Sequence, residues 1–354
     1  MFREKINLIL LAGVISLGSC TDIENTEKKD PLVDFQVSYE VSSFRLDISD
    51  SLFRARNLLL VDNILVVKDE DLIFSYKLVD VAQDRFLKRF GKIGQGPCEI
   101  DDFNTLNRSG DTGQILGIFQ MQSGKFQEFI VSELVVSDEN PECVPLTDRF
   151  DTGFRDVLRV AENTFVATSF GENPFVLLKG KEIVQSIGEY PFQDQFNELN
   201  PMTLALANQS KLYKNPTEPL ILNSSYSSFN MEILELDLEG KLTIKKTMHF
   251  WPTEFVDSSS GPGFGVTLNR ENRFGNISTS VSNRYIYVLY NDKPWEYQLP
   301  LKSNRVLVYD WEGKSVKILK LDREISQIAI HESDSYLIGY VDDGKANLFR
   351  FEVE

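Results

Sequence analysis

Histidine and cysteine are scarce in this chain of 354 residues, which has two histidines and three cysteines. Neither type occurs at the short spacings of a structural zinc site. No Gly-x-Ser-x-Gly elbow is present to mark a serine nucleophile, and His249 and His331 both fall at predicted strand ends or turns. We therefore assign the chain no catalytic residue, no metal site and no cofactor from its motifs.

Positive charge is also in short supply. The 37 Lys and Arg residues face 53 Asp and Glu residues, which gives a formal net charge of −16. Nucleic-acid binding needs clustered cations to neutralise phosphates, so nucleic acid is excluded as a partner class. An acidic surface of this kind favours solubility and repels other acidic surfaces.

Long apolar runs are absent as well, because no segment reaches the about 20 apolar residues of a membrane-spanning helix. The longest, Ile6–Leu17, follows Arg3 and Lys5 and leads into Leu-Gly-Ser-Cys at Cys20. That ending resembles a bacterial lipobox, in which the cysteine is lipidated and becomes the N-terminus. A plain secretory signal with an incidental cysteine is the alternative.

The lipobox resemblance predicts three regions: a signal peptide at 1–19, a lipidated Cys20 with a polar tether through residue 34, and a folded body at 35–354. The protein is then held at the bacterial cell envelope through its lipid alone. The outer membrane, on its periplasmic face or at the cell surface, is the expected site. In that oxidising compartment Cys98 and Cys143 can pair, with two free buried thiols as the alternative.

Strand patterns dominate the chain from residue 35 onward. Segments such as Phe35–Ile48, Leu58–Lys68 and Tyr285–Tyr290 alternate apolar and polar residues and are bounded by Gly, Asn or Asp. One short helix is expected after the Asn200-Pro201 start signal, running to Leu212. The fold class is therefore all-β.

A repeated turn points to a particular all-β architecture. Asp237-Leu-Glu-Gly-Lys, Asp310-Trp-Glu-Gly-Lys and Asp342-Asp-Gly-Lys each separate two strands. None has the twelve-residue alternation of a calcium loop, so they are interpreted as hairpins. Four-stranded repeats of about 50 residues predict a β-propeller of about six antiparallel blades. Its last unit shows three strands, so we expect the strand at Phe35–Ile48 to complete it and close the ring.

The segment Phe-Gly-Lys-Ile-Gly-Gln-Gly-Pro-Cys-Glu resembles the link between blades in NHL-type propellers and in TolB-like six-bladed propeller lipoproteins. Its turn residues are Gly91, Gly94, Gly96 and Pro97. The resemblance implies the six-bladed fold but no established reaction. Cys98 stands where the family usually has Gly, which raises the question of backbone strain there. A phosphate-binding loop is disfavoured, because acidic residues rather than a helix follow the glycines.

An insertion rich in Gly, Ser and Pro supplies the candidate binding residues. Ligands of propellers usually bind over the central channel, where loops converge, and Arg and aromatic side chains suit carboxylates, sugars and peptides. A loop packing its own aromatic residues over a blade is the alternative. The candidates are Asn269, Arg270 and Arg273, with Trp295 and Tyr297 further on.

The sequence thus predicts an envelope lipoprotein whose propeller binds or scaffolds a peptide, a glycan or a partner protein. A propeller hydrolase or lyase acting at the mouth of the channel is the alternative function.

Overall fold

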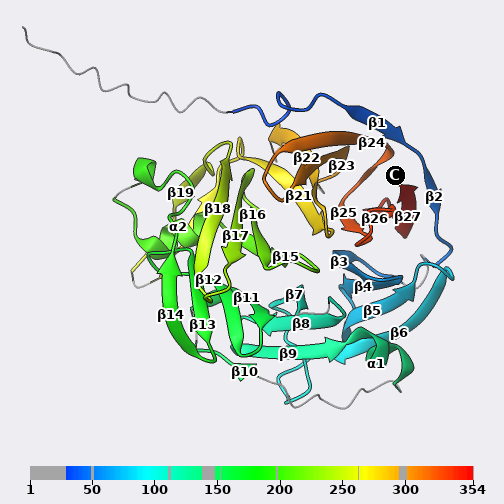
Figure 1. The fold of residues 1–354 in the computed structure, drawn as a ribbon, viewed down its shortest axis with the longest axis horizontal. Helices are drawn as coiled ribbons and strands as arrows, with labels where there is room; N and C mark the ends of the chain where they lie inside the picture. The colour runs from blue at the N-terminus through cyan, green and yellow to red at the C-terminus, as the bar shows by residue number, and fades with distance from the viewer. Residues whose placement is uncertain are drawn as a thin grey trace, which may run out of the picture.

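Six four-stranded blades lie side by side in a ring around a central axis (Figure 1). The computed structural model describes residues 29–48, 52–110, 113–137, 148–151, 153–196, 198–261, 263–294 and 301–353. Apart from two strands that the N-terminal segment adds to the last two blades, neighbouring strands within a blade run antiparallel and follow one another in the sequence from the axis outward. The predicted six-bladed propeller is confirmed.

The first three blades are formed by strands that follow one another directly in the chain. They are β3 (Ala55–Val61), β4 (Ile64–Asp69), β5 (Phe74–Asp80) and β6 (Arg85–Lys92); β7 (Asn104–Ser109), β8 (Ile115–Gln120), β9 (Lys125–Ile130) and β10 (Asp148–Arg149); and β11 (Phe154–Ala161), β12 (Thr164–Ser169), β13 (Phe175–Lys179) and β14 (Glu182–Ile187).

The last three blades hold the additional features. They contain β15 (Ser210–Lys214), β16 (Leu220–Ser225), β17 (Asn230–Leu236) and β18 (Leu242–His249); β21 (Arg273–Val281), β22 (Tyr285–Pro294), β23 (Ser303–Asp310) and β24 (Ser315–Ile325); and β25 (Gln327–Ile330), β26 (Tyr336–Asp342) and β27 (Ala346–Glu352). A separate hairpin of β19 (Phe255–Asp257) and β20 (Val266–Leu268) lies in the predicted insertion before β21.

The N-terminal segment closes the ring, as predicted, but it does so with two strands. β1 (Ser38–Val41) adds to the fifth blade in parallel with β24, and β2 (Ser43–Arg45) pairs antiparallel with β27 as the fourth strand of the last blade. Ser43 between them donates its backbone N–H and its hydroxyl to the carboxylate of Asp322, at 3.0 and 2.9 Å. One short segment therefore ties together two blades that stand far from it in the chain.

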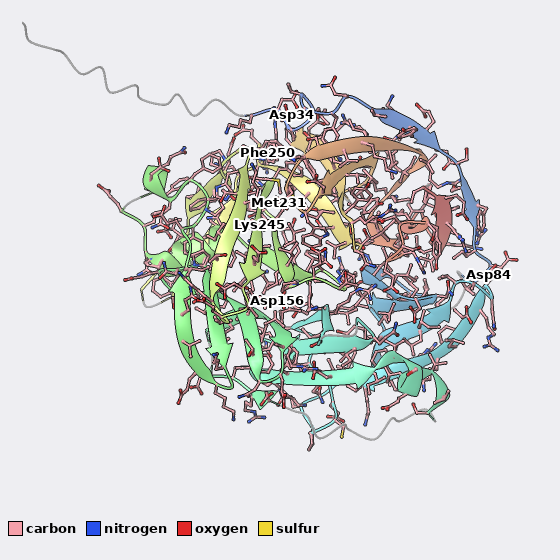
Figure 2. All side chains as sticks on the ribbon, viewed as in Figure 1. Asp34, Asp84, Asp156, Met231, Lys245 and Phe250 are labelled. Carbon is pink, nitrogen blue, oxygen red and sulfur yellow. The ribbon has the colours of Figure 1, made fainter. Side chains whose placement is uncertain are left out.

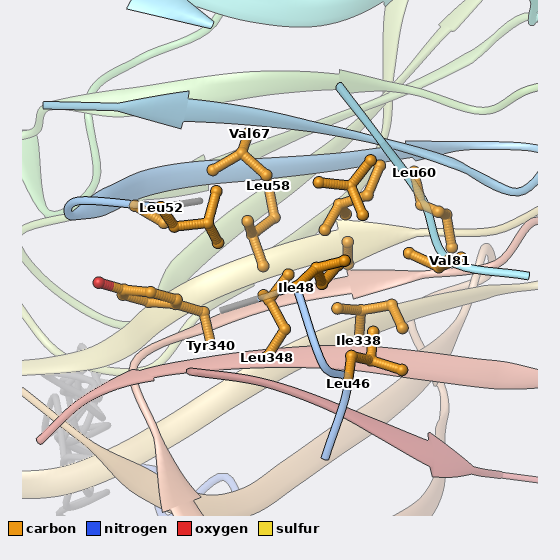
Figure 3. Close-up of a cluster of buried hydrophobic side chains, with 14 of the residues drawn as sticks. Leu46, Ile48, Leu52, Leu58, Leu60, Val67, Val81, Ile338, Tyr340 and Leu348 are labelled. Atoms are coloured by element: carbon orange, nitrogen blue, oxygen red, sulfur yellow. The ribbon is translucent and has the colours of Figure 1, made fainter. Parts of the chain in front are cut away.

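A buried apolar cluster continues this closure into the first blade. After β2, Leu46, Ile48 and Leu52 pass between the last and first blades, where they pack with side chains of both (Figure 3). Partners include Leu58 of β3 and Leu348 of β27. Burying apolar surface at this junction stabilises the folded ring, because those side chains leave water only when first and last blades meet.

The described helices are short excursions between strands. They are α1 (Val131–Val136), the 3-10 helix η2 (Gln193–Phe196) and α2 (Pro201–Ala207). Asn200 caps α2 as expected, its side chain accepting from the N–H of Met202 at 2.9 Å. No helix of the described residues is long and apolar enough to cross a membrane.

The predicted end of that helix at Leu212 is wrong. α2 stops at Ala207, and Ser210–Lys214 is instead β15, the innermost strand of the fourth blade. Helix-forming residues and a strong start signal favoured the longer helix, but tertiary packing overrides such local preferences. In β15, Leu212 is fully buried in the core between the third and fourth blades while its neighbours follow the other face of the strand.

Truncating Leu46 should test whether closure stabilises the whole ring. Leu46 is 2 % exposed, so Leu46→Ala should lower the free energy of unfolding by about 2–5 kcal/mol, measured by urea denaturation. Phe44, two residues earlier on β2 and 51 % exposed, is the matched control, and Phe44→Ala should cost less than about 1 kcal/mol. Equal losses in the two variants would argue against the junction as a stabilising core.

Candidate functional site

The six innermost strands all begin at one face of the ring, because every blade has the same orientation. We call this the start face and the opposite one the end face. These strands, β3, β7, β11, β15, β21 and β25, surround the axis. Between their first halves lies a cavity of about 290 Å³ at the start face. Its walls thus come from several blades that only the closed ring brings together.

The lining of this channel cavity is polar and carries positive charge only. Three cations line it, and no Asp or Glu does, although the chain has a net charge of −16. Amide and hydroxyl side chains supply most of the remaining polar surface. The polar lining residues are the cations Arg56, Lys68 and Lys211, the amides Asn57, Asn104, Asn276 and Gln327, and the hydroxyls Thr105, Tyr213, Tyr226, Ser278 and Thr279.

Arg56 is the one cation of the three that already has an acidic partner. Its guanidinium is hydrogen-bonded to the carboxylate of Glu70, which follows β4. Its charge is therefore largely neutralised, and the positive character of the channel cavity comes from the two lysines.

Lys211 is buried and bonded only to a neutral group. Its Nζ donates to Oδ1 of Asn57 at 3.1 Å, its one hydrogen bond in the described residues. An ammonium has three donors, so two remain without a hydrogen-bond acceptor, although the ring of Tyr213 lies below the ammonium with its centroid 5.0 Å from Nζ. Burial lowers the pKa of Lys211 to about 8, a shift that nearby Asp156 opposes and Lys68 reinforces.

Lys68 is in a similar position on the neighbouring wall. Its Nζ donates to the backbone carbonyls of Asn104 at 2.7 Å and Asp102 at 3.4 Å. Burial lowers its pKa also to about 8, against the opposing effect of Asp102 and Asp101. At neutral pH both amines are thus mostly charged, yet poorly solvated, and an anion placed between them would supply the missing interactions.

The carboxylate nearest to Lys211 faces away from this cavity and serves the ring itself. Asp156 of β11 is fully buried and lies close to the centre of the ring (Figure 2). It accepts from Thr105 Oγ1 at 2.6 Å, Asn107 Nδ2 at 2.9 Å and the N–H of Leu212 at 3.0 Å. One carboxylate therefore joins the inner strands of the second, third and fourth blades, and its oxygens are already occupied.

Toward the end face the channel closes. The free volume falls to about 20 Å³ where Leu58–Leu60, Leu106 and Ile330 approach the axis. There the buried Arg108 donates to the carbonyl of Gly113 at 2.8 Å and also to the carbonyl of Leu60, and it pairs with Glu332 at 3.3 Å. The channel cavity is consequently open at the start face and blind at its other end.

A second hollow extends the cavity outward over the first blade. This groove of about 410 Å³ shares Arg56, Lys68 and Asn104 with the channel cavity. Unlike the cavity, it is lined by carboxylates, those of Asp69, Glu70, Asp71 and Asp102. The two hollows together offer hydrogen-bond donors at the axis and acceptors further out.

The insertion residues predicted from sequence lie at the same face, but outside this cavity. Asn269 and Arg270 are in the turn between β20 and β21, and Arg273 is the exposed first residue of β21. Further along the same strand, Asn276–Thr279 reach the channel cavity, whereas these three do not line it. Trp295 and Tyr297 lie outside the described residues, so the insertion site stays a prediction.

The glycine-rich segment begins in the last residues of β6, which include Gly91, and continues into the connection to β7 that links the first two blades. Gly91 has a φ of +70°, a conformation that glycine adopts without strain. A side chain at Gly94 would collide with the carboxylate of Glu99, which accepts from the N–H of Gly96 at 2.9 Å. Cys98 does not have a positive φ, so the departure from glycine there causes no such strain.

Cys98 is disulfide-bonded. Cys143, the partner considered from the sequence, and the predicted lipidation site Cys20 both lie outside the described residues. Pro97 lines a further hollow of about 610 Å³ beside the blade link. Lys125 lines the same hollow and donates to the carbonyls of Gly96 and Glu99 at 2.8 and 2.9 Å. These two hydrogen bonds hold the connection between the first two blades in place.

The two histidines are too far apart to share a site. His249 ends β18 at the start face and bonds to Glu232, whereas His331 follows β25 at the end face and bonds to Ser333 at 2.8 Å. No group of three or more His, Cys, Asp or Glu side chains in the described part of the chain is placed to hold a metal ion.

Sequence reasoning missed the two lysines for different reasons. Lys211 was assigned to the end of a helix rather than to a strand that faces the axis. Lys68 was placed in a strand, but its distance of 143 positions from Lys211 hid their shared cavity. The available signal was the alternation Lys211-Leu212-Tyr213, in which the apolar residue enters the core and the polar ones follow the other face.

Comparison with known proteins finds similarity to other propellers. A family model described as "TolB-like 6-blade propeller-like" matches residues 55–333. A crystal structure of a Bacteroides fragilis protein, described as exported and solved at 2.60 Å resolution, is similar with a TM-score of 0.54 and 12% sequence identity. That similarity covers 90% of this chain and 99% of the other. No curated protein matches the chain.

The desolvation of Lys211 predicts a specific pH dependence of stability. With a pKa of about 8 in the folded state against 10.5 unfolded, the unfolded chain binds more protons between these values. Relative to Lys211→Met, the wild type should therefore gain up to about 3 kcal/mol in unfolding free energy as pH rises from 8 to 10.5. Urea denaturation of both proteins at several pH values measures this difference.

Lys245 provides the matched control on the outer strand β18. Its pKa is raised by a hydrogen bond to Glu312, so the difference between wild type and Lys245→Met should stay level from pH 8 to 10. If the difference in unfolding free energy from the wild type followed the same course with pH in Lys211→Met and Lys245→Met, Lys211 would not be held in a desolvated, charged form.

Proposed function

The chain belongs to the TolB-like six-bladed propeller family, and we propose that it is a lipid-anchored binding module of the bacterial envelope whose channel cavity takes an anionic group. The observation that carries the proposal is the lining of that cavity. The buried ammonium group of Lys211 and the partly buried one of Lys68 line it together, no carboxylate does, and the surrounding chain is strongly acidic. A cavity of this charge is unfavourable when empty and becomes favourable when an anion enters.

The ligand classes proposed are a peptide, a glycan or part of a partner protein. Each can present a carboxylate, and the amide and hydroxyl side chains around the lysines can hydrogen-bond to the atoms next to it. Desolvation raises the pKa of Tyr213, so its phenol stays protonated and is able to donate. An anionic end group would thus meet donors from several blades at once.

The alternative function, a hydrolase or lyase at the channel mouth, has no specific support. General acid–base catalysis most often uses a positioned imidazole or carboxyl group, and in the groove at the channel mouth Glu70 and Asp71 are ion-paired with Arg56 and Lys77. None of the described residues that line the channel cavity is Asp, Glu, His or Cys. We therefore retain binding or scaffolding as the proposed role.

Anion binding should stabilise the protein and depend on the two lysines. In a titration of the full-length protein with sodium citrate at constant ionic strength, the melting temperature should rise with citrate. The double substitution Lys68→Met and Lys211→Met should abolish the rise, whereas Lys245→Met should leave it intact. Above pH 8 affinity should fall, by up to tenfold per pH unit for each lysine that loses its proton.

The same titration discriminates between the channel cavity and the insertion. Replacing Arg270 and Arg273 by Ala should leave the citrate effect unchanged if the channel cavity is the site. Loss of the effect in that variant, with retention in the double lysine variant, would move the site to the insertion and refute the proposal.

Membrane attachment is proposed to depend on Cys20 alone. Because lipidation of the cysteine is the only anchor in this scheme, Cys20→Ser should move the protein from the membrane fraction to the soluble fraction. Fractionation with immunodetection measures the change. A variant that stays with the membranes would contradict the lipoprotein assignment.

A further inference from the structure

We propose that the channel cavity recognises the C-terminal carboxylate of an extended peptide whose preceding residues lie in the groove and against an apolar rim. The inference rests on the proposed anion site and specifies its ligand. Three features of the start face support it: the blind end of the cavity, the opposite chemistry of the groove, and a group of exposed apolar side chains beside both.

The blind end favours a terminal group over an internal segment. A chain that threaded the ring would have to pass Arg108, which is buried and bonded to the carbonyl of Gly113 and to Glu332. The remaining space there is about 20 Å³, close to the volume of a single water molecule. The 290 Å³ cavity above it admits one end group and its neighbour, so the ligand enters by its end.

The groove suits a chain that carries hydrogen-bond donors. Its lining includes the carboxylates of Glu70, Asp71 and Asp102, while the channel cavity presents the donors of Lys68 and Lys211. Glu70 is ion-paired with Arg56 and Asp71 with Lys77, but each carboxylate has about four lone-pair sites and so keeps accepting capacity beside its pair. A peptide that ends in the cavity matches this order, because its terminal carboxylate accepts hydrogen bonds and the amides before it donate them.

The apolar rim distinguishes a peptide from a glycan. Phe53, Leu72, Ile73 and Phe103 are large apolar residues exposed at the start face, Leu72 to 95 % and Phe103 to 58 %. Their side chains do not line the groove, but their backbones are next to residues that do: Phe53 donates its N–H to Asp69 at 2.9 Å, Leu72 follows Asp71, and Phe103 lies between Asp102 and Asn104. Aromatic rings alone would also suit sugars, but the aliphatic Leu72 and Ile73 offer only apolar contact. We therefore infer apolar residues just before the C-terminus.

The decisive experiment compares a free and an amidated C-terminus. A fluorescein-labelled hexapeptide of leucine, phenylalanine and glycine is titrated with the full-length protein, and fluorescence anisotropy gives the dissociation constant. The free acid should bind at least tenfold more tightly than the same peptide with a C-terminal amide. Lys211→Met should weaken the free acid to the level of the amide and leave the amide unchanged.

The rim is tested in the same assay. Leu72→Ser combined with Phe103→Ser should weaken both peptide forms by a similar factor, because the rim contacts the apolar residues and not the terminus. Val136→Ser is the control, since Val136 is a similarly exposed apolar residue of α1 in another part of the second blade. It should change neither constant.

Several outcomes would overturn the inference. Equal binding of acid and amide, or tighter binding of an oligosaccharide of glucuronic acid than of the peptide, would exclude a peptide C-terminus while citrate binding still supports the anion site. If citrate does not raise the melting temperature of the wild type, or raises it equally in the double lysine variant, the proposed function itself is refuted. Failure of the peptide inference and failure of the proposed function therefore give different results.

Discussion

The pairing of β2 with β27 is the contact on which the rest of the structure depends. The last blade has three strands of its own, and an open row of backbone groups on β27 would invite pairing with another chain. By filling that place, β2 brings the first and last blades together over the Leu46 cluster. Only in the closed ring do six inner strands converge on one axis, and only then does a channel exist.

The convergence of the six inner strands on the axis places polar side chains where little water can reach them. Asp156 satisfies its oxygens by joining three inner strands, so its charge is used for cohesion. Lys211 and Lys68 are different, because their partners are neutral oxygens and their ammonium groups stay partly unsatisfied. Natural proteins commonly accept such local instability at functional sites, where the ligand supplies the missing interaction. This contrast distinguishes the carboxylate at the structural centre of the ring from the cations of the proposed anion site.

Repetition made the fold predictable. The turns at Asp237 and Asp310 sit at equivalent places between the third and fourth strands of successive blades, and each Asp accepts two backbone N–H groups. The similar turn at Asp342 joins the second and third strands of the last blade instead. The last repeat had only three predicted strands, which indicated that an N-terminal strand completes it and closes the ring. The site was harder, because its residues are distributed over strands that local patterns do not relate. Lys211 shows this most clearly, since helix propensity concealed a strand whose identity depends on Leu212 entering the core.

The place where the N-terminal segment leaves the ring bears on what can reach the channel cavity. Lys29 donates its N–H to the carbonyl of Phe250, just beyond β18 and therefore at the start face. It lies nine positions after Cys20. Fully extended, this stretch spans about 30 Å, comparable to the diameter of a small domain. If the protein is anchored through Cys20, the point where the tether meets the start face lies at most that far from the bilayer. From the membrane side, an extended chain would then reach the open mouth more readily than a folded protein.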